Sequence, residues 1–172
     1  MSSPPALWSS DYKKKVIPPA ELAGWAEGIK EQKRKITTLN GSFDLLHAGH
    51  LQIIYEASQV GDVLIVALNT DHSIRQYKSP TRPIITLEYR LQMMAALEFV
   101  GYVTWFDETT PCHILSLIKP DIHVNGIEYG HNCIEAETIH KYGGKIHIVQ
   151  LIPGLSTSSI ITKIREGDSS CA

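Results

Sequence analysis

The chain has 172 residues, the length of one ordinary domain, so it leaves little room for a second one. Its 43% hydrophobic and 20% charged residues are close to the average of globular proteins, which argues against wholesale disorder. Sixteen Lys and Arg residues against eighteen Asp and Glu residues give a formal net charge of -2. The basic excess that non-specific nucleic-acid binding needs is therefore missing, and we expect no nucleic-acid partner.

We also expect no membrane partner, because no apolar run approaches the roughly 20 residues that a membrane-spanning helix needs. The N-terminus begins with serines and prolines instead of a charged region followed by an apolar one, so no export signal is indicated. The three cysteines are widely spaced and form no C-x-x-C pair, which favours neither a disulfide framework nor a zinc cage. These features predict a cytoplasmic protein.

Residues 1–17 are rich in proline, serine and lysine, and we interpret them as an arm with no core of its own. An amphipathic helix is expected from Pro18 to Lys35, where apolar residues recur at helical spacing. We take residues 18–166 as a single domain that includes this helix, and residues 167–172 as a tail.

Short apolar runs alternate with helical patterns along the rest of the chain. The expected strands are Ile36–Leu39, Val63–Leu68, Tyr102–Phe106, Ile122–Val124 and Ile146–Leu151. The second run is apolar without alternation, which is typical of a strand covered on both faces in a parallel sheet. Two helical stripes are expected to face the core: Leu51, Ile54, Tyr55 and Ser58, and then Leu87, Leu91, Met94 and Ala95.

This order predicts an α/β fold with a Rossmann-like, open and mostly parallel sheet and helices on both of its faces. Ligands of such sheets bind at the carboxyl ends of the strands. The sequence contains neither a P-loop nor a G-x-G-x-x-G segment, so a P-loop kinase and a dinucleotide oxidoreductase have no support.

The first expected strand runs into the segment Gly41-x-Phe43-Asp44-x-x-His47-x-Gly49-His50, and the next helix begins at about Gly49. A helix N-terminus favours phosphate because its free N–H groups carry partial positive charge. At a spacing of three, His47 and His50 can both donate hydrogen bonds to one anion as negative charge builds up on it. Without the surrounding context, the same pair could be two surface histidines or one half of a metal site.

This segment resembles the signature of the nucleotidyltransferase superfamily that includes the cytidylyltransferases and several adenylyltransferases. A second superfamily segment, Gly-x-Ser-Thr at the start of the last helix, appears as Gly154-Leu155-Ser156-Thr157, where serine and threonine also suit a helix cap. From about Lys15 to Arg165 the chain is most similar to the heptose 1-phosphate adenylyltransferase domain of the ADP-heptose synthases. Other matching segments are Lys78-Ser79-Pro80-Thr81-Arg82-Pro83, Glu88-x-Arg90, Trp105 to Pro111 and Lys119-Pro120-Asp121.

The resemblance implies a role for sixteen residues of this chain, and all of the following are expectations. The catalytic residues are His47, His50 and Lys78. The nucleotide-binding residues are Gly41, Ser42, Phe43, Gly49, Arg90, Gly154, Ser156, Thr157 and Ser158. The substrate-binding residues are Asn40, Asp44, Asn125 and Gly126. No protein residue is assigned to a metal, because Mg²⁺ commonly arrives on the phosphates of its nucleotide, which here is ATP.

The implied reaction transfers AMP from ATP to a sugar 1-phosphate, D-glycero-β-D-manno-heptose 1-phosphate, and releases pyrophosphate. The product would be ADP-heptose for lipopolysaccharide core synthesis, and the enzyme would be a homodimer. Asn125 stands where that group usually has a lysine, and Leu151 stands where cytidylyltransferases usually have an arginine. Two alternatives stay open: a cytidylyltransferase acting on glycerol 3-phosphate or a similar alcohol phosphate, and a nucleotide-binding homologue without turnover.

Overall fold

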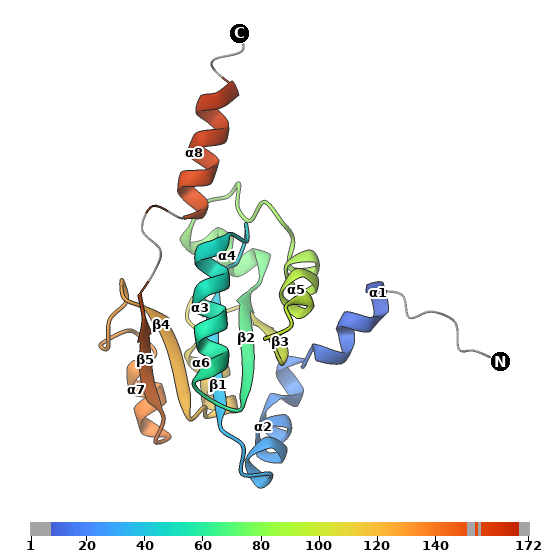
Figure 1. Ribbon diagram of the computed structural model, residues 1–172, viewed down its shortest axis with the longest axis vertical. Coiled ribbons are helices and arrows are strands. Elements are labelled where there is room, and N and C mark those ends of the chain that lie inside the picture. The colour runs from blue at the N-terminus through green and yellow to red at the C-terminus, as the bar shows by residue number, and fades with distance from the viewer. Residues whose placement is uncertain (1–7, 151–153, 155, 169–172) are drawn as a thin grey trace, which may run out of the picture.

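The structure, a computed structural model, describes residues 8–150, 154 and 156–168 of the chain. A single parallel sheet runs through it in the strand order β3-β2-β1-β4-β5 (Figure 1). The strands are β1 (Ile36–Gly41), β2 (Val63–Asn69), β3 (Tyr102–Phe106), β4 (Ile122–Gly126) and β5 (Lys145–Val149). All five expected strands are confirmed, with small differences at their ends, although Leu151 lies outside the described residues.

The order of the strands reverses at the centre of the sheet. From β1 the chain proceeds outward through β2 and β3, and it then returns to the other side of β1 to form β4 and β5. The strand pairs on both sides of β1 are parallel, so β1 and β4 both end at the same edge of the sheet. In open α/β sheets this topological switch point is where ligands bind.

Helices cover both faces of the sheet, as the sequence predicts (Figure 1). One face packs against α3 (Ala48–Gln59) and α5 (Leu87–Ala96). The other face packs against α2 (Leu22–Glu31), α6 (Cys112–Ile118) and α7 (Ala136–Lys141). The shorter α4 (Asp71–Tyr77) follows β2, and α8 (Thr157–Asp168) extends from the carboxyl edge of the sheet. None of the described helices is long and apolar enough to cross a membrane.

The expected stripe on α3 is partly wrong. Ile54 is fully buried, but the side chains of Leu51 and Tyr55 are 39% and 52% exposed. The face that meets the sheet carries Ile53 and Ala57 instead. The expectation took the residues at helical spacing from Leu51, whereas the helix is rotated so that the adjacent stripe of Ile53, Ile54 and Ala57 meets the sheet. On α5 the expected stripe is confirmed, because Leu91, Met94 and Ala95 are buried and Leu87 packs partly against them.

We expected the amino-terminal segment to be an arm with no core of its own, but its described part packs against the domain. The described part begins with α1 (Trp8–Asp11) and a short 3-10 helix (Tyr12–Lys15). Tyr12 is only 6% exposed and belongs to the core cluster on the α3 and α5 face. Val16 forms a parallel bridge to Val103 on β3. Residues 1–7 of the expected arm and residues 169–172 of the expected tail lie outside the described residues.

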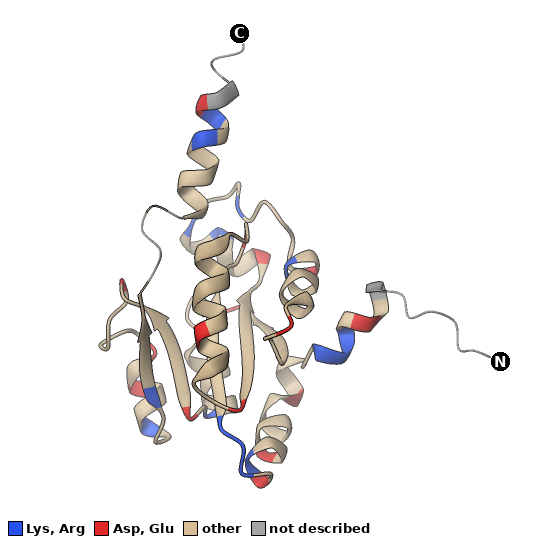
Figure 2. Cartoon of the chain, in the orientation of Figure 1, with Lys and Arg blue, Asp and Glu red and all other residues tan. Residues whose placement is uncertain are grey.

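The helix expected from Pro18 to Lys35 is shorter than its pattern suggests. It begins as a 3-10 turn (Pro19–Glu21), continues as α2, and ends at Glu31. Lys33 has a φ of 58°, a left-handed conformation that cannot continue a right-handed helix. The basic residues 33–35 therefore form the link to β1, at the edge of the sheet opposite its carboxyl ends (Figure 2).

Candidate active site

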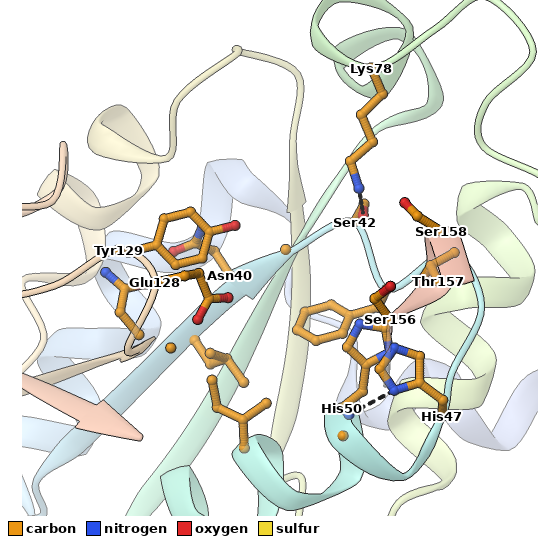
Figure 3. Close-up of a pocket in the computed structure, with 17 residues that line it drawn as sticks. Asn40, Ser42, His47, His50, Lys78, Glu128, Tyr129, Ser156, Thr157 and Ser158 are labelled. Carbon is orange, nitrogen blue, oxygen red and sulfur yellow. Dashed lines mark hydrogen bonds between the residues drawn. The ribbon is translucent and has the colours of Figure 1, made fainter. Parts of the chain in front are cut away.

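A cavity of about 280 Å³ opens at the carboxyl ends of β1 and β4, at the switch point of the sheet. Most of the residues that the sequence assigns to the site contribute to its walls (Figure 3). They are Asn40, Gly41, Ser42, Phe43, His47, Gly49, His50, Lys78, Asn125, Gly126, Ser156, Thr157 and Ser158. Segments from β1, α3, α4, β4 and α8 that are far apart in sequence thus meet in one place.

His47 and His50 lie at the amino end of α3. His47 is the residue before the helix, and its Nδ1 accepts a hydrogen bond from the backbone N–H of His50 across 3.4 Å. The two imidazole rings stack, with their centroids 3.8 Å apart and their planes 21° apart. The Phe43 ring meets His50 edge-on at 5.3 Å. This packing fixes both rings beside the free N–H groups of the helix.

Burial of the His50 imidazole lowers its pKa to about 4, and the neighbouring His47 contributes to this shift. Burial also lowers the pKa of His47. Near neutral pH both rings are therefore uncharged in the free protein, and each can still donate one N–H to a phosphate oxygen.

Gly41 makes the packing of Phe43 possible. A Cβ at position 41 would lie 3.0 Å from the Phe43 ring, a tighter contact than side chains usually tolerate. Phe43 itself has a φ of 43°, so the chain turns sharply directly after β1. This turn brings Ser42 to the rim of the cavity, where its Oγ accepts a hydrogen bond of 2.7 Å from Nζ of Lys78.

Lys78 lies directly after α4 and points across the cavity toward Ser42 (Figure 3). Partial burial lowers the pKa of Lys78, and the nearby Arg82 lowers it further, while Asp44 opposes the shift. The resemblance implied that this cation belongs to the site, and the structure places it on the same side of the cavity as the two histidines.

The start of α8 forms another part of the wall. Ser156 and Ser159 cap the helix reciprocally: each backbone N–H donates to the other residue's Oγ, at 3.2 and 3.1 Å. The expected capping role is thus confirmed. Gly154 does not line the cavity, but its φ of 78° is a left-handed conformation that suits glycine and allows the turn into α8.

Arg90 and Asp44 do not line the cavity either. Arg90 is 1% exposed, and its guanidinium donates to the carbonyl oxygens of Ile85 and Ser42 and to Oδ1 of Asp71, at 2.7–2.9 Å. The structure places it beneath the turn after β1, with its donors engaged by the protein.

Asp44 holds the segment that follows Lys78. Its buried carboxylate accepts hydrogen bonds from Nε of Arg82 at 2.5 Å and from the backbone N–H groups of Ile84 and Ile85 at 2.8 and 2.9 Å. Three protein donors thus make this carboxylate an anchor of the segment, and its expected contact with the substrate stays a prediction.

Two polar residues of the wall are absent from the sequence-based assignment, Glu128 and Tyr129. Both follow β4 in a turn in which the N–H of Tyr129 donates to the carbonyl oxygen of Gly126 across 3.1 Å. Their position after a strand of a parallel sheet was the available signal, since such residues lie at the ligand-binding edge. In the described part of the chain, no group of three or more His, Cys, Asp or Glu side chains could hold a metal ion.

The comparisons with known proteins agree with this geometry. The cytidylyltransferase-like family model matches residues 38–170. The bifunctional protein HldE of Geobacter metallireducens is 40% identical over 83% of this chain, and that of Hahella chejuensis is 41% identical over 77%. The chain spans less than a third of either relative's length, 29% and 28%.

A solved structure described as the lipopolysaccharide core biosynthesis protein from Thermoplasma volcanium is 29% identical, with a TM-score of 0.56. The likeness covers 69% of this chain and 97% of that one. The family model, these relatives, the parallel sheet and the paired histidines at a helix N-terminus all agree. The chain therefore belongs to the cytidylyltransferase-like family and is a nucleotidyltransferase.

Proposed function

We propose that this nucleotidyltransferase transfers AMP from ATP to D-glycero-β-D-manno-heptose 1-phosphate and thereby forms ADP-heptose for lipopolysaccharide core synthesis. The observation that carries the proposal is one cavity in which His47, His50 and Lys78 lie on the same side. The motif resemblance to heptose 1-phosphate adenylyltransferases supports the choice of sugar, and the description of the Thermoplasma volcanium relative supports the choice of pathway.

The chemistry is a single phosphoryl displacement. A phosphate oxygen of the acceptor attacks the α-phosphorus of ATP, the bond from that phosphorus to the oxygen bridging to the β-phosphate breaks, and pyrophosphate leaves with the electron pair. No covalent bond to the protein is needed, so the protein contributes positioning and charge neutralisation.

Each named side chain has a part in this step. The N–H groups of His47 and His50 donate to phosphate oxygens, and these bonds strengthen as charge moves onto the leaving pyrophosphate. Lys78 moves from the Ser42 hydroxyl to the reacting phosphates and neutralises their charge. The hydroxyl groups of Ser156 and Ser158 lie in the same wall and can donate to the nucleotide.

Magnesium fits this site as a companion of the nucleotide. Glu128 is the single carboxylate among the described residues of the cavity wall, which is too few ligands for a cage of protein side chains. Mg²⁺ would therefore take most of its ligands from phosphate oxygens and water, and it would supply further neutralisation of phosphate charge.

The proposal is tested by measuring pyrophosphate release with ATP and with CTP. Each donor is combined with heptose 1-phosphate and with glycerol 3-phosphate. The expected result is turnover with ATP and heptose 1-phosphate. A preference for CTP and glycerol 3-phosphate would assign the chain to the cytidylyltransferases, and ATP binding without any pyrophosphate release would make it a non-catalytic homologue.

We further propose that the enzyme acts in the cytoplasm, where its ATP donor is available, and that it forms a homodimer. The cytoplasmic location agrees with the cysteine pattern of the sequence, and the dimer follows from the resemblance. Analytical ultracentrifugation at several protein concentrations tests the dimer, and a sedimentation coefficient of the monomer throughout would reject it.

A further inference from the structure

The cavity has two ends of different charge (Figure 3). Lys78, the two histidines and the α8 serines lie at one end. Glu128, Tyr129 and Asn40 lie at the other, and Glu128 brings a carboxylate into a cavity that otherwise suits phosphate. A carboxylate repels a phosphate group, so phosphate binding does not explain the residues at the Glu128 end of the cavity.

Glu128 lies in a turn at the end of β4. A Cβ at Gly126 would lie 2.3 Å from Oε2 of Glu128, so the carboxylate rests directly against the glycine and any larger residue would displace it. The N–H of Ile127 donates to the carbonyl oxygen of Val149 on β5 across 3.0 Å, and Tyr129 closes the turn on Gly126. The turn thus places the exposed Glu128 side chain at the sheet edge, with its carboxylate lying against the backbone of Gly126.

Two amide side chains beside it have buried atoms without a hydrogen-bond partner among the described residues. These atoms are Oδ1 of Asn40, an acceptor, and Nδ2 of Asn125, a donor on a residue that is only 5% exposed. Buried polar atoms in proteins nearly always have partners. A hydroxyl group both donates and accepts, so a hydroxyl-rich ligand could satisfy both amides and the Glu128 carboxylate.

Tyr129 adds an aromatic surface that suits such a hydroxyl-rich ligand. Its side chain is 64% exposed in the free protein although it lines the cavity, so the face of its ring is available to the C–H groups of a ligand. An aromatic face next to hydrogen-bonding groups fits a molecule with one apolar side and many hydroxyls better than a second anion.

We propose that Glu128 selects the acceptor: its carboxylate accepts hydrogen bonds from hydroxyl groups at the polyol end, and it excludes acceptors that carry a second phosphate there. The proposal rests on the function proposed above and deepens it. The acceptor binds in one orientation, with its single phosphate toward Lys78 and its uncharged hydroxyls toward Glu128. A second phosphate offers acceptor oxygens only, and its charge meets the carboxylate unfavourably.

The kinetic test compares heptose 1-phosphate with heptose 1,7-bisphosphate as acceptors for ATP. The wild-type enzyme should prefer the monophosphate by about ten-fold or more in kcat/KM. Glu128→Gln keeps the size of the side chain and removes its charge, so this preference should shrink by about ten-fold. Glu128→Ala should raise KM for the monophosphate by about ten- to a hundred-fold, with a smaller change in kcat and an unchanged Kd for ATP.

Glu137→Gln is the matched control, because Glu137 is an exposed glutamate in the first turn of α7 and does not line the cavity. It should leave both the KM and the preference between acceptors unchanged. A Glu128→Gln enzyme that discriminates as strongly as the wild type would overturn the role of Glu128, even if heptose 1-phosphate is the substrate.

Calorimetric titration of the two sugar phosphates into the full chain gives a second measurement that needs no turnover. Tighter binding of the monophosphate that depends on Glu128 supports the inference, even if no pyrophosphate is released and the proposed reaction fails. Equal affinities of wild-type, Glu128→Gln and Glu128→Ala proteins would reject the inference, and so would the absence of any binding to the wild type.

Discussion

Nζ of Lys78 donates a hydrogen bond to Oγ of Ser42 across 2.7 Å, so the segment after α4 touches the turn after β1 at the rim of the cavity. This contact is between a charged and a neutral group, and it costs little to exchange it for a contact with phosphate. The free protein therefore holds the Lys78 ammonium close to the place where we expect the triphosphate.

The first prediction follows from this placement. Lys78→Ala should lower kcat/KM by about ten- to a hundred-fold, because one charge-assisted contact to the reacting phosphates is lost. Lys14→Ala is the control, since Lys14 is a 77% exposed lysine paired with Asp11, distant from the cavity wall. Steady-state pyrophosphate release measures both variants, and equal losses in the two would remove Lys78 from the mechanism.

The second prediction concerns His50. Replacing it with alanine should lower kcat by about a hundred- to a thousand-fold, the usual cost of losing one donor to a developing anion. The Kd of ATP should change much less, because the bond strengthens mainly in the transition state. Titration with a non-hydrolysable ATP analogue gives the Kd, and single-turnover rates give the chemical step.

His131→Ala is the companion variant, as His131 is exposed on the surface and does not line the cavity. If His50→Ala turns over as fast as this control, hydrogen bonding by His50 plays no part in catalysis. If it loses ATP affinity and turnover in equal proportion, His50 binds the ground state and the transition state alike.

The fold could be predicted because its signals are local. The uninterrupted apolar run Val63–Leu68 specifies a strand buried on both faces, and β2 is indeed buried along its whole length. The position of the histidine pair was predicted correctly, because two residues three apart at the start of a helix lie on the same side of it. Both predictions depend only on residues that are close together in the sequence.

Arg90 and Asp44 show what sequence could not decide. A buried arginine that donates to backbone carbonyls and one that binds a phosphate require the same residue type and the same helix position. Only the tertiary packing settles the direction, and it directs Arg90 to Ser42 and Asp71. Tyr12 was missed for a related reason, since nothing near it in sequence indicates that it packs against the distant core.

The third prediction tests this structural role of Arg90. Arg90→Ala leaves the carbonyl oxygens of Ser42 and Ile85 without their donors and should lower the free energy of unfolding by about 3–5 kcal/mol. The ATP affinity of the folded fraction should remain close to that of the wild type. Urea denaturation and ATP titration measure the two quantities, and a fully stable variant with weak ATP binding would restore Arg90 as a phosphate ligand.

The fourth prediction concerns acid stability and arises from His123 on β4. The side chain is fully buried, its Nδ1 lies 2.8 Å from Oγ1 of Thr38, and its Nε2 has no hydrogen-bond partner among the described residues. Burial lowers the pKa of His123, and the nearby Glu135 only partly opposes this shift. The folded protein thus holds this imidazole in its neutral form below the pH at which an exposed histidine would gain a proton.

The sign of the effect follows from linkage. As the pH falls below about 6.5, the unfolded chain takes up a proton that the folded protein refuses, so the free energy of unfolding decreases toward the lowered pKa. His50 acts in the same direction because its pKa is lowered to about 4. Each histidine can contribute a slope of at most about 1.4 kcal/mol per pH unit, and stability is greatest above this window.

Urea denaturation between about pH 7.5 and about pH 4.5 measures this dependence. His123→Gln should flatten the profile because it removes one group that gains a proton on unfolding, and His50→Gln should do the same at a site outside the core. His131→Gln, a change at an exposed histidine, should leave the profile of the wild type intact. If all three variants lose stability with acid as steeply as the wild type, carboxylates and not buried imidazoles govern the acid limit of this fold.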